Sequence, residues 1–243
     1  GMVCLAPVLA KLLNPVSVPI YTFLGADPSI FAGTILANDM GGYPLAMEMA
    51  HTEEAGLLAG TILAAMLGCT VVFTIPVGLG IIEERYRPEF AQGILVGVMM
   101  IPLGVLAGGL VAGFDLMMIV ANLVPIVIAA VLIALGLWRI PGLMTRGFLV
   151  FGKFLVAIIS IALGIATFEY LTGFQIMPTG WELAPVMEGM EIVAMICLFL
   201  MGAFALMHVV VKVGARPLGA LGRLLGINEV ASGGLIISLA NAI

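Results

Sequence analysis

The stretch GADPSIFAGTILANDMGGYPLA, from Gly25 to Ala46, decides how this chain folds. Its apolar residues suit a lipid bilayer, yet it also contains two aspartates, an asparagine, two prolines and a Gly-Gly step. Asp27 can cap a helix that starts at Pro28, because proline lacks the amide proton that a first helical turn leaves unpaired. From Asn38 to Pro44 a regular helix is costly, since two glycines and a proline follow closely. The stretch therefore predicts a helix that is interrupted within a membrane.

The whole chain has the composition of an integral membrane protein. Of its 243 residues, 63% are hydrophobic and 9% charged, whereas a soluble domain is about 25% charged. Abundant glycine and few aromatic residues favour closely packed helices over a β-barrel. We predict an all-α, polytopic membrane protein with a transporter-like helical bundle in one transmembrane domain, residues 1–243. Nothing in the sequence resembles a basic nucleic-acid-binding face.

Long intervals without charge predict the membrane spans, since a spanning helix needs about 20 mostly apolar residues. Five intervals qualify: Ala55–Ile82, which is either tilted or kinked at Pro76, Phe90–Phe114, Leu116–Trp138, Gly147–Phe168 and Ile192–Val211. Residues 1–10 look like the tail of an apolar helix, and the chain stops inside an apolar segment. We therefore expect a fragment of a longer protein. Each cysteine lies alone in an apolar run, which predicts packing residues at Cys4, Cys69 and Cys197.

The loop charges predict the orientation in the membrane. After every second predicted crossing the loops carry cations, namely Arg85, Arg87, Arg139, Arg146, Lys212, Arg216 and Arg223, and the opposite loops are acidic. Because lysine and arginine collect on the cytoplasmic side, we expect the arginine loops there. The polar segment Tyr170–Glu191 is then an external loop or a short interfacial helix, best explained as a solvated connection.

A second stretch repeats the pattern of the first. In GINEVASGGLIISLANAI, Gly226–Ile243, a glycine, a polar residue two positions later and a further glycine match Gly25, Asp27 and Gly33. Many transporters consist of two repeats whose interrupted helices meet near the bilayer midplane. We predict two related broken-helix repeats, residues 25–46 and 226–243. Whether the first crosses the membrane or re-enters it stays open.

Asp39 is the strongest candidate for a residue that binds a substrate or an ion. A charged side chain at the centre of a spanning helix costs roughly 2.5 to 3.5 kcal/mol on insertion scales, and the loop cations are too distant to pair with it. A cation from outside is the obvious partner; the alternative is that Asp39 only caps the helix that follows. Asn38 could bind a ligand or could only cap the broken helix. Tyr43 could bind a ligand or could be an interfacial residue, and the sequence favours neither alternative for either residue. Asn122 is more typical of a hydrogen bond between helices.

Three pieces of the sequence resemble one family. The D-P-S-x-F-A-G-T and D-M-G-G motifs of the first stretch, the segment GCTVVFTIPVGLGII at Gly68–Ile82 and the final GGLIISLANAI are similar to the EutH family, the ethanolamine permeases of bacterial ethanolamine utilisation. The resemblance implies a multi-pass protein of the bacterial inner (cytoplasmic) membrane that carries ethanolamine into the cell. It implies no cofactor and no metal.

The resemblance also suggests roles for the candidate residues. Asp39 would attract the ammonium of ethanolamine, and Asn38 or Tyr43 would serve its hydroxyl, with Asp27 added to this set. From the second repeat, Asn241 and Ser238 would complete the cavity. The alternatives are a carrier of another small amine or solute, coupled to sodium or protons, and a channel-like facilitator. The sequence lacks the H-E-x-x-H and G-x-S-x-G motifs of enzymes, so we expect no enzyme; a homo-oligomer stays open.

Overall fold

A computed structural model describes residues 1–195, 197–198 and 201–202, in two compact units, residues 1–189 and 190–243. In the second unit the described residues are helical. Most of the predicted span Ile192–Val211 lies outside the described residues. So does the whole second repeat, including Ser238 and Asn241. The helices and the candidate site described below all belong to the first unit.

The regular elements of the first unit are helical, in agreement with the predicted class. In chain order they are α1 (Met2–Phe23), α2 (Ser29–Ile35), η1 (Asn38–Gly42), α3 (Tyr43–Met49), α4 (Glu53–Leu57), η2 (Leu58–Gly68), η3 (Thr70–Thr74), α5 (Ile75–Ile81), η4 (Glu84–Tyr86), α6 (Arg87–Val111), α7 (Leu116–Arg139) and α8 (Pro141–Thr172). Among the described residues, five helical segments are long and apolar enough to cross a membrane: Met2–Phe23, Glu53–Gly78, Glu84–Val111, Leu116–Arg139 and Gly142–Thr172. The last four correspond to predicted spans, which confirms a multi-pass membrane protein.

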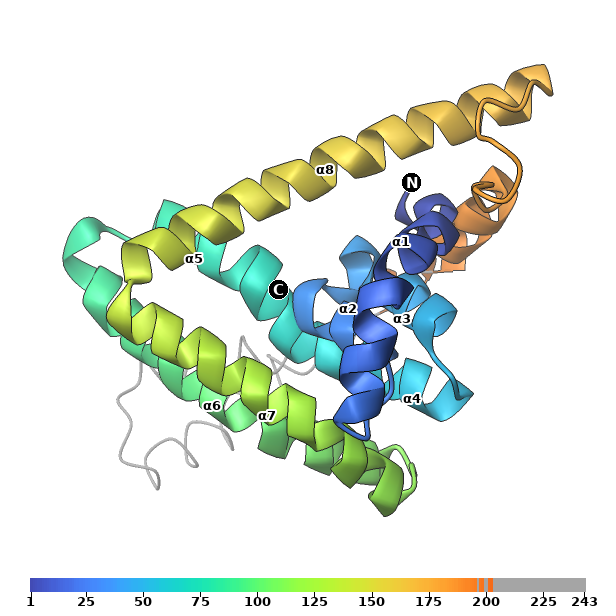
Figure 1. The fold of residues 1–243 in the computed structure, drawn as a ribbon. Helices are drawn as coiled ribbons and strands as arrows, with labels where there is room; N and C mark the ends of the chain where they lie inside the picture. Colours follow the sequence, from blue (N-terminus) through green and yellow to red (C-terminus); the bar gives the residue numbers. More distant parts are fainter. Residues whose placement is uncertain (196, 199–200, 203–243) are drawn as a thin grey trace. The chain divides into compact units, whose positions relative to one another are not determined.

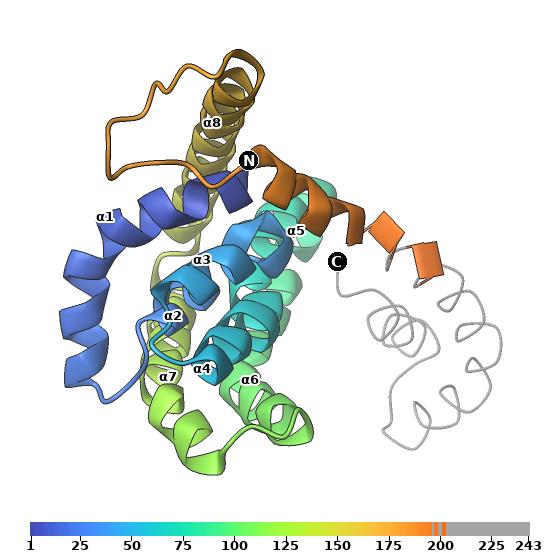
Figure 2. The same cartoon turned by 90° about the vertical axis from the view of Figure 1, so that its right-hand side faces the viewer.

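The segment Met2–Phe23 was missing from the predicted spans. The sequence indicated a helix only over residues 1–10, because Lys11 and three prolines interrupt the apolar run, yet α1 continues through Pro7, Pro15 and Pro19. Such prolines are tolerated in membrane helices when neighbouring groups satisfy the freed backbone. Proline bends a helix, and Figure 2 shows α1 curving around α2 and α3.

The segment Glu53–Gly78 is wider than a regular α-helix over most of its length. Leu58–Gly68 and Thr70–Thr74 form π-helical turns, which the sequence did not predict; a tilt or a kink at Pro76 stays a prediction. Threonine hydroxyls donate to backbone carbonyls here: Thr61 to Leu57 (2.5 Å), and Thr70 to Met66 (2.6 Å). Such bonds compete with the backbone ladder and distort helices. A π-helical segment is rare and occurs often at functional sites.

The core of this unit lies around α2 and α3. Ile30, Leu36 and Leu45 are fully buried, together with Leu63 and Leu67 of η2. In contrast, α6, α7 and α8 expose many large apolar side chains, and α6 and α7 lie side by side in Figure 1. An exposed apolar surface of this kind suits contact with lipid.

The segment after α8 is a loop attached to α1. Glu169 Oε1 accepts hydrogen bonds from the amides of Ile176 (2.7 Å) and Met177 (2.9 Å). The Lys11 ammonium donates to the Gly180 carbonyl at 2.5 Å, and the amide of Ala184 donates to the Cys4 carbonyl at 2.9 Å. The segment that we predicted to be a solvated connection is therefore a loop that is hydrogen-bonded to the N-terminal half of α1. The number of predicted membrane crossings gave no indication of this attachment.

Candidate functional site

The predicted interruption is present, and backbone geometry defines it. Helix α2 ends at Ile35, and Leu36 and Ala37 are extended, with φ/ψ of −123°/136° and −65°/149°. The Ala37 carbonyl then accepts hydrogen bonds from the amides of Met40 (3.1 Å) and Gly42 (2.8 Å). Gly41 has φ of +100°, which only glycine adopts without strain. The sequence Asn38–Gly42 thus forms a tight reversal between α2 and α3.

Helices α2 and α3 form a hairpin whose two ends meet. Asp27, just before α2, accepts a hydrogen bond at Oδ1 from the amide of Ser29 (2.9 Å). Its Oδ2 accepts another from the amide of His51, just after α3 (2.9 Å). The first bond is the kind expected of a capping aspartate, although the N-cap position of α2 is Pro28, one residue later than predicted. The second brings the two ends of the segment together, so that α2 and α3 have the shape of a re-entrant hairpin.

Asn122 attaches the open end of this hairpin to α7. Its Oδ1 accepts a hydrogen bond from the Asp27 amide at 2.7 Å, and its Nδ2 donates to the Met118 carbonyl at 2.9 Å. The residue is 3% exposed. The sequence-based assignment of Asn122 to a hydrogen bond between helices is confirmed.

Helix α2 packs backbone to backbone against η2, through glycine. A Cβ atom at Gly33 would overlap the Ala59 carbonyl, and one at Gly68 would overlap the Leu36 carbonyl. On the α3 side, a Cβ at Gly60 would lie 2.9 Å from the Tyr43 Cα. Gly68 lies well inside the segment Glu53–Gly78, which is long enough to cross the membrane. The tip of the hairpin therefore lies beside the interior of a span, far from its ends.

The tip presents the polar candidates. Asn38 and Asp39 are exposed, and Tyr43 is half-buried against η2. Among the described residues the ion pairs are Arg85–Glu83 and Arg87–Glu84, so none there neutralises Asp39.

The comparisons with known proteins agree with the family resemblance. A family model described as "Ethanolamine utilisation protein, EutH" matches residues 1–243. The chain belongs to the EutH family. No solved structure matches it.

Curated relatives of this EutH chain match along its whole length. It is 54% identical over 243 residues to a "Probable ethanolamine permease EutH" of Listeria monocytogenes, and covers 64% of that protein. It is 43% identical over 264 aligned residues to the protein of the same name in Salmonella typhimurium, of which it covers 65%. An "Uncharacterized protein YxeR" of Bacillus subtilis is 48% identical over 244 residues, again with 65% covered. The chain thus spans less than two thirds of the length of these relatives.

The structure brings together only some of the predicted substrate-binding residues of this EutH chain. Asn38, Asp39 and Tyr43 lie at the tip. Asp27 lies at the open end, about 10 Å away along the seven residues of α2, and both its carboxylate oxygens are hydrogen-bonded. Asn241 and Ser238 lie outside the described residues. Cys69, which the sequence predicted to be a packing residue, is buried.

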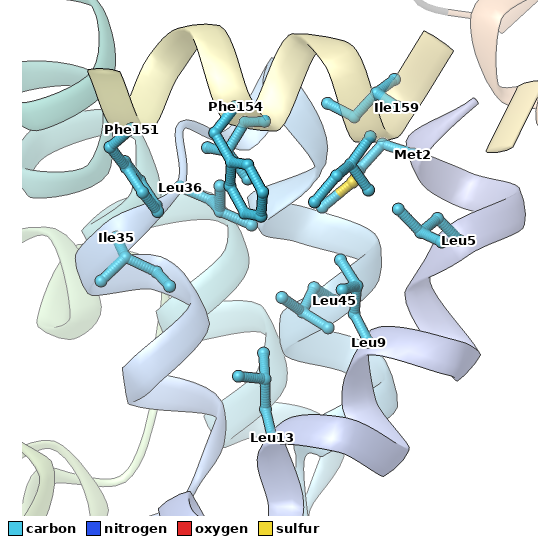
Figure 3. Close-up of a pocket in the computed structure, with 12 residues that line it drawn as sticks. Met2, Leu5, Leu9, Leu13, Ile35, Leu36, Leu45, Phe151, Phe154 and Ile159 are labelled. Carbon is cyan, nitrogen blue, oxygen red and sulfur yellow. The ribbon is translucent and has the colours of Figure 1, made fainter. Parts of the chain in front are cut away.

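A cavity of about 140 Å³ lies on another side of the hairpin in this EutH unit. Its wall is apolar and comes from α1, α8 and the hairpin: Met2, Leu5, Leu9, Leu13, Ile35, Leu36, Leu45, Phe151, Phe154, Leu155, Ile158 and Ile159. Figure 3 shows side chains of α1 and α8 directed towards this space. Moving an ammonium into it would leave the charge without water or a polar partner, which is costly. The tip with Asp39, rather than this cavity, suits a small cation.

Proposed function

We propose that this chain is part of a carrier that moves ethanolamine across the bacterial cytoplasmic membrane, and that Asp39 binds the ammonium of the substrate. The observation that carries the proposal is the position of Asp39, an exposed carboxylate at the tip of a re-entrant hairpin, beside the interior of a spanning segment. Interrupted helices of this kind line the binding sites of many transporters.

The charge of Asp39 supports this assignment. An ionised carboxylate at membrane depth is stabilised by an opposite charge or by a hydrated cavity, and the described residues supply no cation to it. An alkylammonium ion would supply that charge with hydrogen bonds to the carboxylate, and such charge-assisted bonds are about twice as strong as neutral ones. Relatives of the chain are named as probable ethanolamine permeases, and ethanolamine is a small alkylammonium ion at neutral pH.

The hydroxyl of ethanolamine distinguishes it from a plain amine. On the hairpin itself, Asn38 offers an amide and Tyr43 a phenol, and both lie within one helical turn of Asp39 along the chain. We propose these two as polar neighbours of the substrate. The second repeat, with Asn241 and Ser238, would close the site from the other side, as paired repeats do in other carriers.

The test is uptake of labelled ethanolamine at submillimolar concentration and mildly acidic pH, where diffusion of the free base is small. Cells would express the full-length protein or its Asp39→Asn variant, which has almost the same shape without the charge. We expect Asp39→Asn to lose most of the uptake at normal membrane levels. A Glu182→Gln variant removes a carboxylate from an exposed loop and should keep the uptake of the parent.

Two results would overturn the proposal. Equal uptake by the parent and by Asp39→Asn would return Asp39 to the role of a helix cap. Absence of uptake by the parent would exclude ethanolamine and favour another small amine. Accumulation against a gradient, measured with and without sodium, separates a coupled carrier from a passive facilitator.

A further inference from the structure

The loop that follows α8, residues 173–185, is attached to one face of α1, and we call it the strap. Its Ala184 amide donates to the Cys4 carbonyl at 2.9 Å, and its Gly180 carbonyl accepts from the Lys11 ammonium at 2.5 Å. Cys4 and Lys11 are seven residues apart, almost two helical turns, so they share one face of α1. Figure 2 shows the strap running from the end of α8 to the N-terminal end of α1.

The opposite face of the same part of α1 lies against the hairpin. A Cβ at Gly41 would overlap the Met2 side chain, so Met2 covers the hairpin tip two residues from Asp39. Because successive helical residues turn by about 100°, Met2 and Cys4 project from nearly opposite sides of α1. The face of Met2 continues at helical spacing along the apolar cavity, with Leu5, Leu9 and Leu13. The N-terminal half of α1 is thus held between the strap and the hairpin.

The strap is held by few bonds. Its beginning stays with α8, since Glu169 accepts from the amides of Ile176 and Met177. Towards α1, the described residues form two hydrogen bonds, those at Cys4 and Lys11, and most residues of the strap are exposed. A segment with few bonds and little buried surface opens at a low cost in free energy. The strap can therefore detach from α1 while the helices that it connects stay folded.

The packing of α1 on the other side also leaves room for movement. The cavity of about 140 Å³ separates α1 from α8 and the hairpin, whereas most protein interiors have few voids larger than a water molecule. Pro7, Pro15 and Pro19 remove backbone hydrogen bonds within α1. The N-terminal half of α1 can therefore bend away from the hairpin once the strap has detached.

We infer that the strap is a gate for the site at Asp39. While the strap is attached, α1 keeps Met2 on the hairpin tip; when it detaches, the N-terminal half of α1 moves and opens the tip. The inference rests on the proposed function, because a carrier opens its binding site to the two sides of the membrane in turn. It also explains Lys11, since a charged residue within a span is costly unless it has a partner, and here the partner is the strap.

A disulfide between α1 and the end of the strap tests the gate. A Cβ at Gly189, just beyond the strap, would lie 3.6 Å from the Cys4 Sγ, so Gly189→Cys can form a disulfide with Cys4 after a small shift. The variant would be made in the full-length protein with its other cysteines replaced by alanine, and reconstituted in lipid vesicles. We expect the reduced protein to take up labelled ethanolamine, the oxidised protein to lose most of this uptake, and dithiothreitol to restore it. Gly189→Ser forms no disulfide and should keep its uptake under the same oxidant.

A second measurement follows the strap without transport. Cys4 is 1% exposed, so its thiol should react with a maleimide only when the strap is detached. Lys11→Met should label at Cys4 at least about tenfold faster than the parent, because it loses a hydrogen bond that involves a charged group. Lys153→Met removes an exposed lysine from α8 and should label at the rate of the parent.

Full uptake after complete formation of the disulfide would overturn the inference and leave the carrier proposal intact. Equal labelling of Cys4 in Lys11→Met and in the parent would also overturn it, because the strap would then not depend on Lys11. If the parent does not take up ethanolamine, or if Asp39→Asn takes it up normally, the proposed function fails and the gate fails with it.

Discussion

The side-chain oxygen of Asn122 accepts a 2.7 Å hydrogen bond from the backbone amide of Asp27, across 95 residues of sequence. Since the Asp27 carboxylate also accepts from the amides of Ser29, at the start of α2, and of His51, just after α3, this bond fixes the open end of the hairpin to α7. A polar residue buried between membrane helices thus holds the element that presents Asp39.

Replacing Asn122 by alanine should therefore destabilise the protein. The variant leaves the Asp27 amide without an acceptor, which costs about 1 to 2 kcal/mol. Thermal unfolding in detergent should show a lower midpoint for Asn122→Ala. Ser160→Ala, which removes only a bond to the Val156 carbonyl on an exposed face of α8, should change the midpoint little. Equal midpoints for Asn122→Ala and the parent would contradict the role of this bond.

The glycine contact between α2 and η2 predicts a strong effect of a single methyl group. Gly33→Ala places a Cβ on the Ala59 carbonyl, and overpacking of this kind costs about 1 to 3 kcal/mol or more. Gly97→Ala, in the interior of α6, meets no atom within 4 Å and should stabilise its helix by about 1 kcal/mol. Unfolding midpoints that shift in opposite directions would support the contact; a lower midpoint for both would point to a general intolerance of alanine.

Replacing Asn14 on α1 should stabilise the protein. Its Oδ1 is buried and has no hydrogen-bond partner in the part of the chain that the structure describes. Leucine has a similar size and no such group, so Asn14→Leu should raise the unfolding free energy by about 1 to 3 kcal/mol. A loss of stability on thermal unfolding would instead reveal a polar partner for this oxygen.

The loop after α8 depends on one carboxylate. Glu169→Ala removes the acceptor for the amides of Ile176 and Met177, and we expect these two amides to exchange with deuterium at least about tenfold faster, as expected when a bond of about 1.4 kcal/mol is lost. Glu169→Gln keeps an acceptor oxygen and should exchange at a rate closer to that of the parent. Equal exchange in Glu169→Ala would show that the bonds to α1 are sufficient to hold the loop.

The arginine-rich loops predict the orientation of α6 and α7. In a variant without native cysteines, Asp115→Cys should react with a membrane-impermeant maleimide added to intact cells. Arg85→Cys should react only after permeabilisation, because lysine and arginine collect on the cytoplasmic side. The reverse labelling pattern would invert the orientation.

Much of this architecture follows from composition and local chemistry. Charge-free intervals located α6, α7 and α8, and the Gly-Gly step with Pro44 located the interruption, because each effect acts within a few residues. The hairpin was not predictable, since the bond between Asp27 and the His51 amide depends on tertiary packing. The length of α1 was missed because a membrane tolerates prolines that end helices in water.

The glycine contact has a consequence for motion. Helix α2 and η2 touch through backbone atoms at Gly33 and Gly68, with no side chain between them that could change rotamer and let one slide past the other. In the proposed carrier, the hairpin and the segment Glu53–Gly78 would therefore move as one rigid body. The bending would be left to α1, where three prolines remove backbone hydrogen bonds.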